Sequence, residues 1–213
     1  KARTAGERCA LLEAWHALVL AHADDLAHIM TAEQGKPLAE ALGEVRYAAS
    51  FIKWFAEEGR RTGGRNVVSP ERDRRIIVLT EPVGVSAAIT PWNFPAAMIT
   101  RKCAPALAAG CPVVIKPSEM TPFTALALGE LAIRAGFPAG VINIVTGLPA
   151  AIGATITASP LVRKLSFTGS TRVGALLLEQ CARTIKRTSM ELGGNAPLIV
   201  FADADLDLAV KAA

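Results

Sequence analysis

The sequence predicts an α/β protein built on a doubly wound parallel sheet. After Pro82, short apolar runs rich in β-branched residues alternate with segments of helical length. The runs are 83–90, 113–116, 141–145, 164–167 and 197–201, and the helical segments are 96–109, 122–135, 150–158 and 171–182. Strands that are apolar on both faces and separated by helices are typical of a parallel sheet covered on both sides. Because crossovers are right-handed, the carboxyl ends of these strands share one rim, where ligands of open α/β sheets bind.

The region before the predicted sheet is helical. Apolar residues recur at three- and four-residue steps between positions 5 and 56, which predicts two helices. Their predicted break is Gln34-Gly35-Lys36-Pro37, since glycine can end a helix and proline can begin one. Residues 60–70, rich in Gly and Arg, predict a turn or linker, and a strand follows at 75–80.

Composition excludes several classes of protein. The chain has 213 residues, 51% of them hydrophobic and 20% charged, which excludes a disordered protein. Its longest apolar run, 103–115, is too short to span a bilayer. The four cysteines lack the spacing of a metal site or a disulfide framework, and they indicate a reducing cytoplasm. The net charge of +4 is concentrated in arginines between 60 and 75 that have no aromatic neighbours for stacking, so we favour a solvated hairpin over the alternative of a polyanion-binding site.

Polar or glycine-containing turns follow the predicted strands. They are 90–95, 116–119, 146–149, 167–171 and 190–195. Gly169-Ser170-Thr171 opens a helix, where free N–H groups and the positive end of the helix dipole favour a pyrophosphate. Lys116 and Glu119 supply a donor and an acceptor where a ribose would lie in a dinucleotide fold. Each signal alone also fits a plain helix cap or an ion pair, and neither a GxGxxG nor a Walker A loop is present.

Three further side chains are candidates for chemistry. Glu191, before Gly193-Gly194, can serve as a general base. Asn93 can donate its amide to an oxyanion. Arg101 follows Asn93 by about two helical turns, which predicts that it lies on the same face, and an arginine on an apolar helix is expected to bind an anion. The alternatives are a solvated glutamate and an asparagine that bonds its own turn.

Taken together, these motifs are far more specific than any one of them, and they resemble the aldehyde dehydrogenase superfamily. The matching strings are TPWNFP at 90–95, AAGCPVVIKPSE at 108–119, TPFTAL at 121–126, NIVTG at 143–147, FTGST at 167–171 and MELGGNAP at 190–197. Within that superfamily, MITRK at 98–102, LVRKLSFTGST at 161–171 and FADADLDLAV at 201–210 look most like succinate-semialdehyde dehydrogenases.

The resemblance implies NAD(P)-dependent oxidation of an aldehyde through a thiohemiacetal and a thioester, with succinate semialdehyde as the expected substrate. Asn93 resembles the oxyanion donor, Glu191 the base that activates water, Lys102 a buried lysine near the acid–base path, and Arg101 the group that binds the substrate's distal carboxylate. The residues that resemble cofactor contacts are Thr90, Pro91, Trp92, Asn93, Lys116, Ser118, Glu119, Gly153, Gly169, Ser170 and Leu192. No metal is implied. Glutarate semialdehyde as substrate and a non-catalytic cofactor-binding fragment remain alternatives.

The cofactor expected from the residues is NAD. The charge of Glu119 would repel the 2′-phosphate of NADP, whereas Lys116 would attract it, so NADP is the alternative cofactor.

The resemblance also implies an organisation for the chain. Residues 1–58 are expected to form helices that pack on the nucleotide-binding domain, 59–81 part of an oligomerisation hairpin, and 82–213 a Rossmann-like NAD(P)-binding domain. The family's nucleophilic cysteine is expected beyond Ala213, in an absent catalytic domain, so this chain alone is expected to be inactive. A start at Lys1 rather than Met fits a piece of a longer protein. When whole, it is expected to be a cytoplasmic homodimer or homotetramer, with no nucleic-acid or membrane partner.

Overall fold

The predicted parallel sheet is present in the computed structural model, which describes residues 3–213; Lys1 and Ala2, the start of the predicted segment 1–58, lie outside the described residues. Five strands lie in the order β5-β4-β3-β6-β7, and every neighbouring pair is parallel. Their bounds are β3 Val85–Ile89, β4 Val113–Lys116, β5 Ile142–Ile144, β6 Val162–Thr168 and β7 Arg187–Glu191. The doubly wound α/β class is therefore confirmed.

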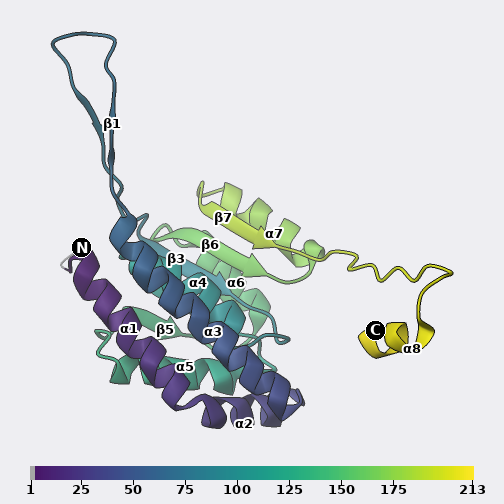
Figure 1. Cartoon of the computed structure of the whole chain (residues 1–213). Coiled ribbons are helices and arrows are strands. Elements are labelled where there is room, and N and C mark those ends of the chain that lie inside the picture. The colour runs from purple at the N-terminus through teal and green to yellow at the C-terminus, as the bar shows by residue number, and fades with distance from the viewer. Residues whose placement is uncertain (1–2) are drawn as a thin grey trace.

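Helices cover both faces of the sheet (Figure 1). They are α4 Ala97–Ala108, α5 Pro122–Arg134, α6 Pro149–Ala158 and α7 Thr171–Ala182. One core joins α4 and α5 to β4 and the N-terminal helices, and a second core joins α6 and α7 to β3 and β6. The chain leaves β3 towards α4 on one face and leaves β6 towards α7 on the other. The switch point of the topology therefore lies between the carboxyl ends of β3 and β6, where such sheets bind ligands.

Three helices, not the predicted two, precede the sheet. They are α1 Ala5–Ala21, α2 Ala23–Gln34 and α3 Leu38–Glu58. The additional break lies at His22, where the sequence has no glycine or proline to signal it. The predicted break before α3 is confirmed, with Gly35 in the left-handed region at φ 81°. These helices pack on α4 and α5, and the Trp15 indole N–H donates to the Leu128 carbonyl at 3.1 Å.

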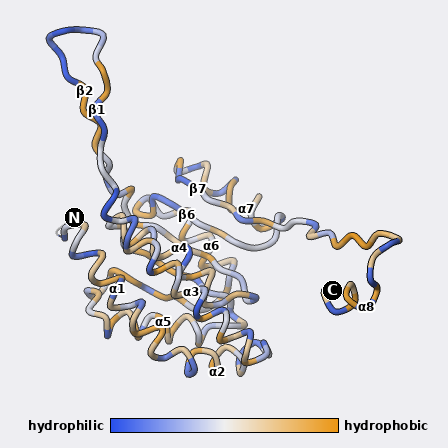
Figure 2. Tube along the Cα trace, in the orientation of Figure 1, coloured by the Kyte–Doolittle hydropathy of each residue, from blue (hydrophilic) through white to orange (hydrophobic). Residues whose placement is uncertain are grey.

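The segment between the helices and the sheet is a hairpin that projects from the body (Figure 1). After a 3-10 turn, η1 Gly59–Arg61, β1 Arg65–Val67 pairs antiparallel with β2 Ile76–Val78. Residues 60–70 thus contain a strand rather than only the predicted turn, because Arg65–Val67 finds a partner in β2. All residues of both strands are exposed, and the end of the hairpin is hydrophilic (Figure 2).

The predicted strand at 197–201 is wrong. This stretch has no assigned secondary structure and pairs with no described strand, and it runs away from the sheet to α8 Leu206–Ala212 (Figure 1). Its apolar side chains are open to solvent, with Phe201 71% exposed, and the run stands out as hydrophobic in Figure 2. An apolar run becomes a strand only where it packs and pairs, and the five-stranded sheet ends at β7.

Candidate active site

The switch point of the sheet carries buried polar atoms without protein partners. Thr90 follows β3 and Thr168 ends β6, and the hydroxyl oxygens of both are buried and form no hydrogen bond within residues 3–213. Beside them, the Gly169 N–H donates to the Glu191 carbonyl at 3.1 Å. A Cβ at Gly169 would lie 2.5 Å from the Phe167 ring, so only glycine fits this turn. The site therefore offers unused hydroxyls to a polar ligand, as a dinucleotide requires.

The predicted pyrophosphate position is the start of α7. Ser170 is its N-cap, and the Ser170 hydroxyl accepts from the Val173 N–H at 3.4 Å. The Leu192 side chain lies over the same turn, since a Cβ at Gly174 would meet it at 2.4 Å. Gly153 is not part of this turn. It is buried inside α6, where the absence of a side chain allows α6 to pack closely against α7.

The turn after β4 brings the other predicted cofactor residues together. The Lys116 side chain, 4% exposed, donates to the Glu119 carboxylate at 2.6 Å. This hydrogen bond holds the pKa of the Glu119 carboxyl below its ordinary value. The Ser118 hydroxyl accepts from the Met120 N–H at 3.2 Å. The pair is fixed by the turn itself, and Glu119 keeps a face open to solvent.

A second group of charges lies between α4 and the end of β7. The Arg101 guanidinium and the Lys102 ammonium each lie 3.5 Å from the Glu191 carboxylate. Lys102 also donates to the Ser166 hydroxyl at 3.2 Å, and its side chain is 2% exposed. Burial lowers the pKa of the Lys102 ammonium, and the nearby Glu191 carboxylate opposes that shift. One half-exposed carboxylate is therefore shared by two cations.

These charges border a cavity of about 550 Å³. Phe51 and Trp54 of α3 form an aromatic wall, and the Arg101 guanidinium lies 5.6 Å from the centroid of the Phe51 ring. Lys164 adds a third cation to the lining. Arginine binds carboxylates through paired hydrogen bonds, so this cavity suits a small molecule that has an anionic end and an apolar stem.

The polar lining shows that β6 is not apolar on both faces, which corrects the expectation for the run 164–167. Leu165 and Phe167 of β6 pack in the second core, whereas Lys164 and Ser166 face the cavities beside α4. The Lys164 ammonium donates to the Ser189 hydroxyl of β7 at 2.6 Å. The alternation of polar and apolar residues along both strands was the signal that could have identified Lys164, Ser166 and Ser189. Phe51 and Trp54 carried no such signal.

Asn93 lies apart from Arg101. It is exposed in the turn after β3 and lines a different cavity, of about 350 Å³, together with Tyr47 and Phe94. The expected common face is therefore wrong, because α4 begins at Ala97 and a helical count cannot be extended back to Asn93. The neighbouring residues of the motif are half-buried at Pro91 and exposed at Trp92.

The described residues include four cysteines. Cys9, Cys103, Cys111 and Cys181 are all free and buried. Burial raises the pKa of the Cys103 thiol to about 12, which leaves it protonated at neutral pH. Residues 3–213 contain no group of side chains arranged to hold a metal ion, and none of their helices is both long and apolar enough to cross a membrane.

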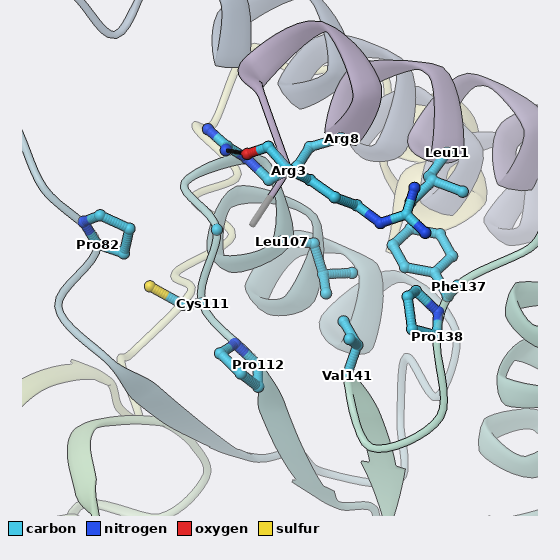
Figure 3. A pocket seen from close by; sticks show the side chains of 11 residues that line it. Arg3, Arg8, Leu11, Pro82, Leu107, Cys111, Pro112, Phe137, Pro138 and Val141 are labelled. Carbon is cyan, nitrogen blue, oxygen red and sulfur yellow. Dashed lines mark hydrogen bonds between the residues drawn. The ribbon is translucent and has the colours of Figure 1, made fainter. Parts of the chain in front are cut away.

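Another cavity, of about 250 Å³, lies at the amino-terminal ends of the strands, opposite the rim (Figure 3). Pro82, Pro112 and Val141, which precede β3, β4 and β5, line it together with Arg8 of α1. The Arg8 guanidinium donates to the Ala108 carbonyl at 2.8 Å, so part of its charge is already used within the fold. None of the predicted site residues lines this cavity.

Comparisons with known proteins agree with the fold. The model of the Aldehyde dehydrogenase family matches residues 1–213. A succinate-semialdehyde dehydrogenase (NADP+) of Escherichia coli is 64% identical over all of the chain, and a glutarate-semialdehyde dehydrogenase of Pseudomonas putida is 61% identical. The crystal structure of a succinate-semialdehyde dehydrogenase from Burkholderia pseudomallei is 64% identical, covers 99% of the chain and superposes with a TM-score of 0.94.

The chain spans 44% of the length of each of these three relatives. The order of its motifs, its five-stranded parallel sheet and the family match over its whole length agree. The chain belongs to the aldehyde dehydrogenase family.

Proposed function

We propose that the whole protein to which this chain belongs oxidises an aldehyde with a distal carboxylate, and that its substrate is succinate semialdehyde. The observation that carries this proposal is the meeting of Arg101, Lys102 and Glu191 at one cavity with an aromatic wall. Arg101 binds the distal carboxylate, and Phe51 and Trp54 contact the methylene stem. The names of the Escherichia coli and Pseudomonas putida relatives support this class of substrate, since both semialdehydes carry a carboxylate.

Glu191 acts as the general base that takes a proton from water during hydrolysis of the thioester. Its place at the end of β7 leaves the carboxylate half exposed to the cavity, which supports this role. Lys102 keeps a positive charge beside this carboxylate and lies on the path of the proton. Asn93 donates its side-chain amide to the oxyanion that develops on the substrate carbonyl.

The cofactor is NAD or NADP, bound at the switch point. When bound, it accepts the hydride of the aldehyde. Support comes from the unused hydroxyls of Thr90 and Thr168 and from the N-terminus of α7, whose dipole favours an anion. Lys116, Ser118 and Glu119 hold the ribose end. The remaining cofactor contacts are Pro91, Trp92, Gly153, Gly169 and Leu192. Lys116 compensates the charge of Glu119, which weakens the sequence argument against a 2′-phosphate.

The nucleophile is a cysteine thiolate elsewhere in the whole protein. Burial of all four cysteines of this chain supports that assignment, and this chain alone is expected to produce no aldehyde-dependent NADH. The exposed hairpin β1–β2 pairs copies of the protein into a dimer or tetramer, which gives its apolar strand residues a partner. Free thiols fit the cytoplasm.

Arg101→Leu in the whole protein tests the proposed substrate class. A lost guanidinium–carboxylate pair is expected to raise KM for succinate semialdehyde about 10- to 100-fold, since a hydrogen bond to a charged group contributes roughly 1.5–3 kcal/mol. KM for butanal, which has no charge, should change little. The matched control is Arg134→Leu, which removes an exposed arginine of α5 that pairs with Glu130.

Two results would contradict the proposal in different ways. An equal rise of KM for both aldehydes would remove the role of Arg101 in binding the carboxylate. A whole protein that reduces neither NAD+ nor NADP+ with any aldehyde, yet binds either cofactor, would favour the second candidate, a cofactor-binding module without catalysis.

A further inference from the structure

The helices α4 and α5 begin without a side-chain cap of their own. The N-cap residues of α4 and α5, Ala96 and Thr121, make no side-chain capping hydrogen bond. The caps come instead from the N-terminal helices. Glu44 of α3 accepts from the Ala96 and Ala97 N–H groups at 2.9 and 3.2 Å. A carboxylate at a helix N-terminus satisfies free N–H groups and complements the helix dipole.

The start of α5 is capped in the same way. Glu33 of α2 accepts from the Phe123 N–H at 2.8 Å and from the Thr124 N–H at 3.0 Å. Glu33 is only half-buried and also accepts from the Thr124 hydroxyl. It forms no ion pair with a described residue. Glu33 therefore provides a natural control for Glu44, with the same chemistry at a different helix.

Glu44 differs because it is linked to the turn that carries Asn93. The Glu44 side chain is 1% exposed and pairs with the Lys36 ammonium. That ammonium also donates to the Asn93 backbone carbonyl at 2.8 Å and lies 4.1 Å from the centroid of the Phe94 ring. Lys36 therefore holds three partners at once, and two of them belong to the turn after β3.

A third contact fixes the same turn. The Gln34 side-chain amide donates to the Trp92 carbonyl at 2.5 Å. The backbone is thus held at Trp92, Asn93 and the start of α4 by side chains of α2, α3 and the link between them. Asn93 itself is exposed, so its side-chain position depends on how firmly this backbone is held.

We propose that Lys36 and Glu44 are positioning residues that set the place of the Asn93 amide; this inference rests on the proposed role of Asn93 as oxyanion donor. Glu44 fixes the first turn of α4 and Lys36 fixes the Asn93 carbonyl, and the buried ion pair couples the two. A shift of about 1 Å in such a group can cost on the order of 100-fold in rate.

Glu44→Gln in the whole protein is the first test. Glutamine keeps the volume and one acceptor but removes the charge that holds Lys36. We expect kcat to fall about 10- to 100-fold, with KM for the aldehyde changed less than about threefold, because positioning for the transition state is lost rather than substrate binding. Glu33→Gln, the same change at α5, should leave kcat within about twofold. Lys36→Met is the second variant if Glu44→Gln does not fold.

A double-mutant cycle with Asn93→Ala separates positioning from stability. If Glu44 acts through Asn93, Glu44→Gln should lower kcat little further when Asn93 is already alanine, since coupled residues are not additive. An equal loss in both backgrounds, or an equal loss with Glu33→Gln, would overturn the proposal.

Hydrogen exchange gives a readout that does not need activity. In Glu44→Gln the Ala96 and Ala97 amides should exchange about tenfold faster, since charge-assisted hydrogen bonds are roughly twice as strong as neutral ones. In Glu33→Gln the faster amides should be those of Phe123 and Thr124. Unchanged exchange at Ala96 and Ala97 would refute the proposal even if the enzyme is active. Faster exchange in a protein without aldehyde oxidation would support Glu44 as the anchor of the turn and reject the proposed function.

Discussion

Two buried lysines, Lys102 and Lys116, each have a glutamate partner, but the two pairs differ in geometry. Lys116 donates to Glu119, three residues away, at 2.6 Å. Lys102 lies 3.5 Å from Glu191, which comes from a distant strand and also faces Arg101. The Lys116–Glu119 pair is a short hydrogen bond within one turn. In the other pair the cation–carboxylate distance is longer, and one carboxylate faces two cations.

The different geometries of the two lysine–glutamate pairs suit different roles. A tight pair formed within one turn fixes charge and shape, which suits binding of a cofactor. A looser carboxylate that borders a cavity can change partners and take up a proton, which suits a general base. The Lys116 hydrogen bond lowers the pKa of Glu119, while burial lowers the pKa of Lys102 against the opposing effect of Glu191.

The largest expected effect separates the two carboxylates. Glu191→Gln in the whole protein should lower kcat about 100- to 10,000-fold, the usual contribution of a general base, with little change in the affinity for the cofactor. Steady-state kinetics and a cofactor titration measure the two quantities. Glu119→Gln, the same change in the other pair, is the control. A similar loss of kcat in both variants would mean that the two pairs do not differ in role.

A smaller effect is expected from Lys102→Met. Loss of the ammonium beside Glu191 should lower kcat about 10-fold or more, as expected for a group on the proton path. Stability should change in the opposite direction. Because burial lowers the pKa of Lys102, the folded protein bears an unfavourable buried charge at pH values below that lowered pKa. This penalty disappears as the pH rises towards 10.5, the ordinary lysine value.

The Tm of Lys102→Met should therefore exceed that of the parent at pH 7, and the gain should shrink at alkaline pH. Lys116→Met, which breaks a closed ion pair and leaves Glu119 alone, should lower the Tm instead. A lower Tm in both variants would show that the contacts of Lys102 to Glu191 and Ser166 outweigh its burial.

The smallest effect is expected at Glu119. Glu119→Gln should shift the ratio of kcat/KM for NADP+ over NAD+ upward by a few-fold, because Lys116 is then free to attract a 2′-phosphate. The stability lost at pH 7 should be below about 1 kcal/mol, since the carboxylate is half exposed. As its pKa is lowered from 4.5, that contribution is present above this pH and is lost as the pH falls through the lowered value. An unchanged cofactor ratio would exclude Glu119 from cofactor selection.

Local patterns predicted most of the elements. The strand Val113–Lys116 and the helix Thr171–Ala182 begin and end where the sequence indicated. The break at His22 was missed because it has no glycine or proline, and 197–201 was wrongly predicted as a strand because its composition could not show that it lacks a partner. The polar face of β6 was missed because the run 164–167 was predicted to be apolar on both faces, whereas Lys164 and Ser166 alternate with Leu165 and Phe167.

The candidate site divides in the same way. Motifs placed Thr90, Lys116, Ser170 and Glu191 at the carboxyl ends of strands, and the sheet brings these ends to one rim. The expected common face of Asn93 and Arg101 failed, because it depended on where α4 begins. No pattern in the sequence indicated that Lys36 and Glu44 reach the Asn93 turn, or that Phe51 packs against Arg101.

The sequence by itself determined the alternating strands and helices and the turns at the rim. Periodicity and turn chemistry depend on neighbouring residues, so they can be read locally. Only the tertiary structure decided which charges meet: Lys102 with Glu191, Lys36 with Glu44 and the Asn93 carbonyl, and Arg101 with the aromatic wall. These contacts depend on how α3 and α4 pack against each other and against the sheet, and that packing is set by the whole core.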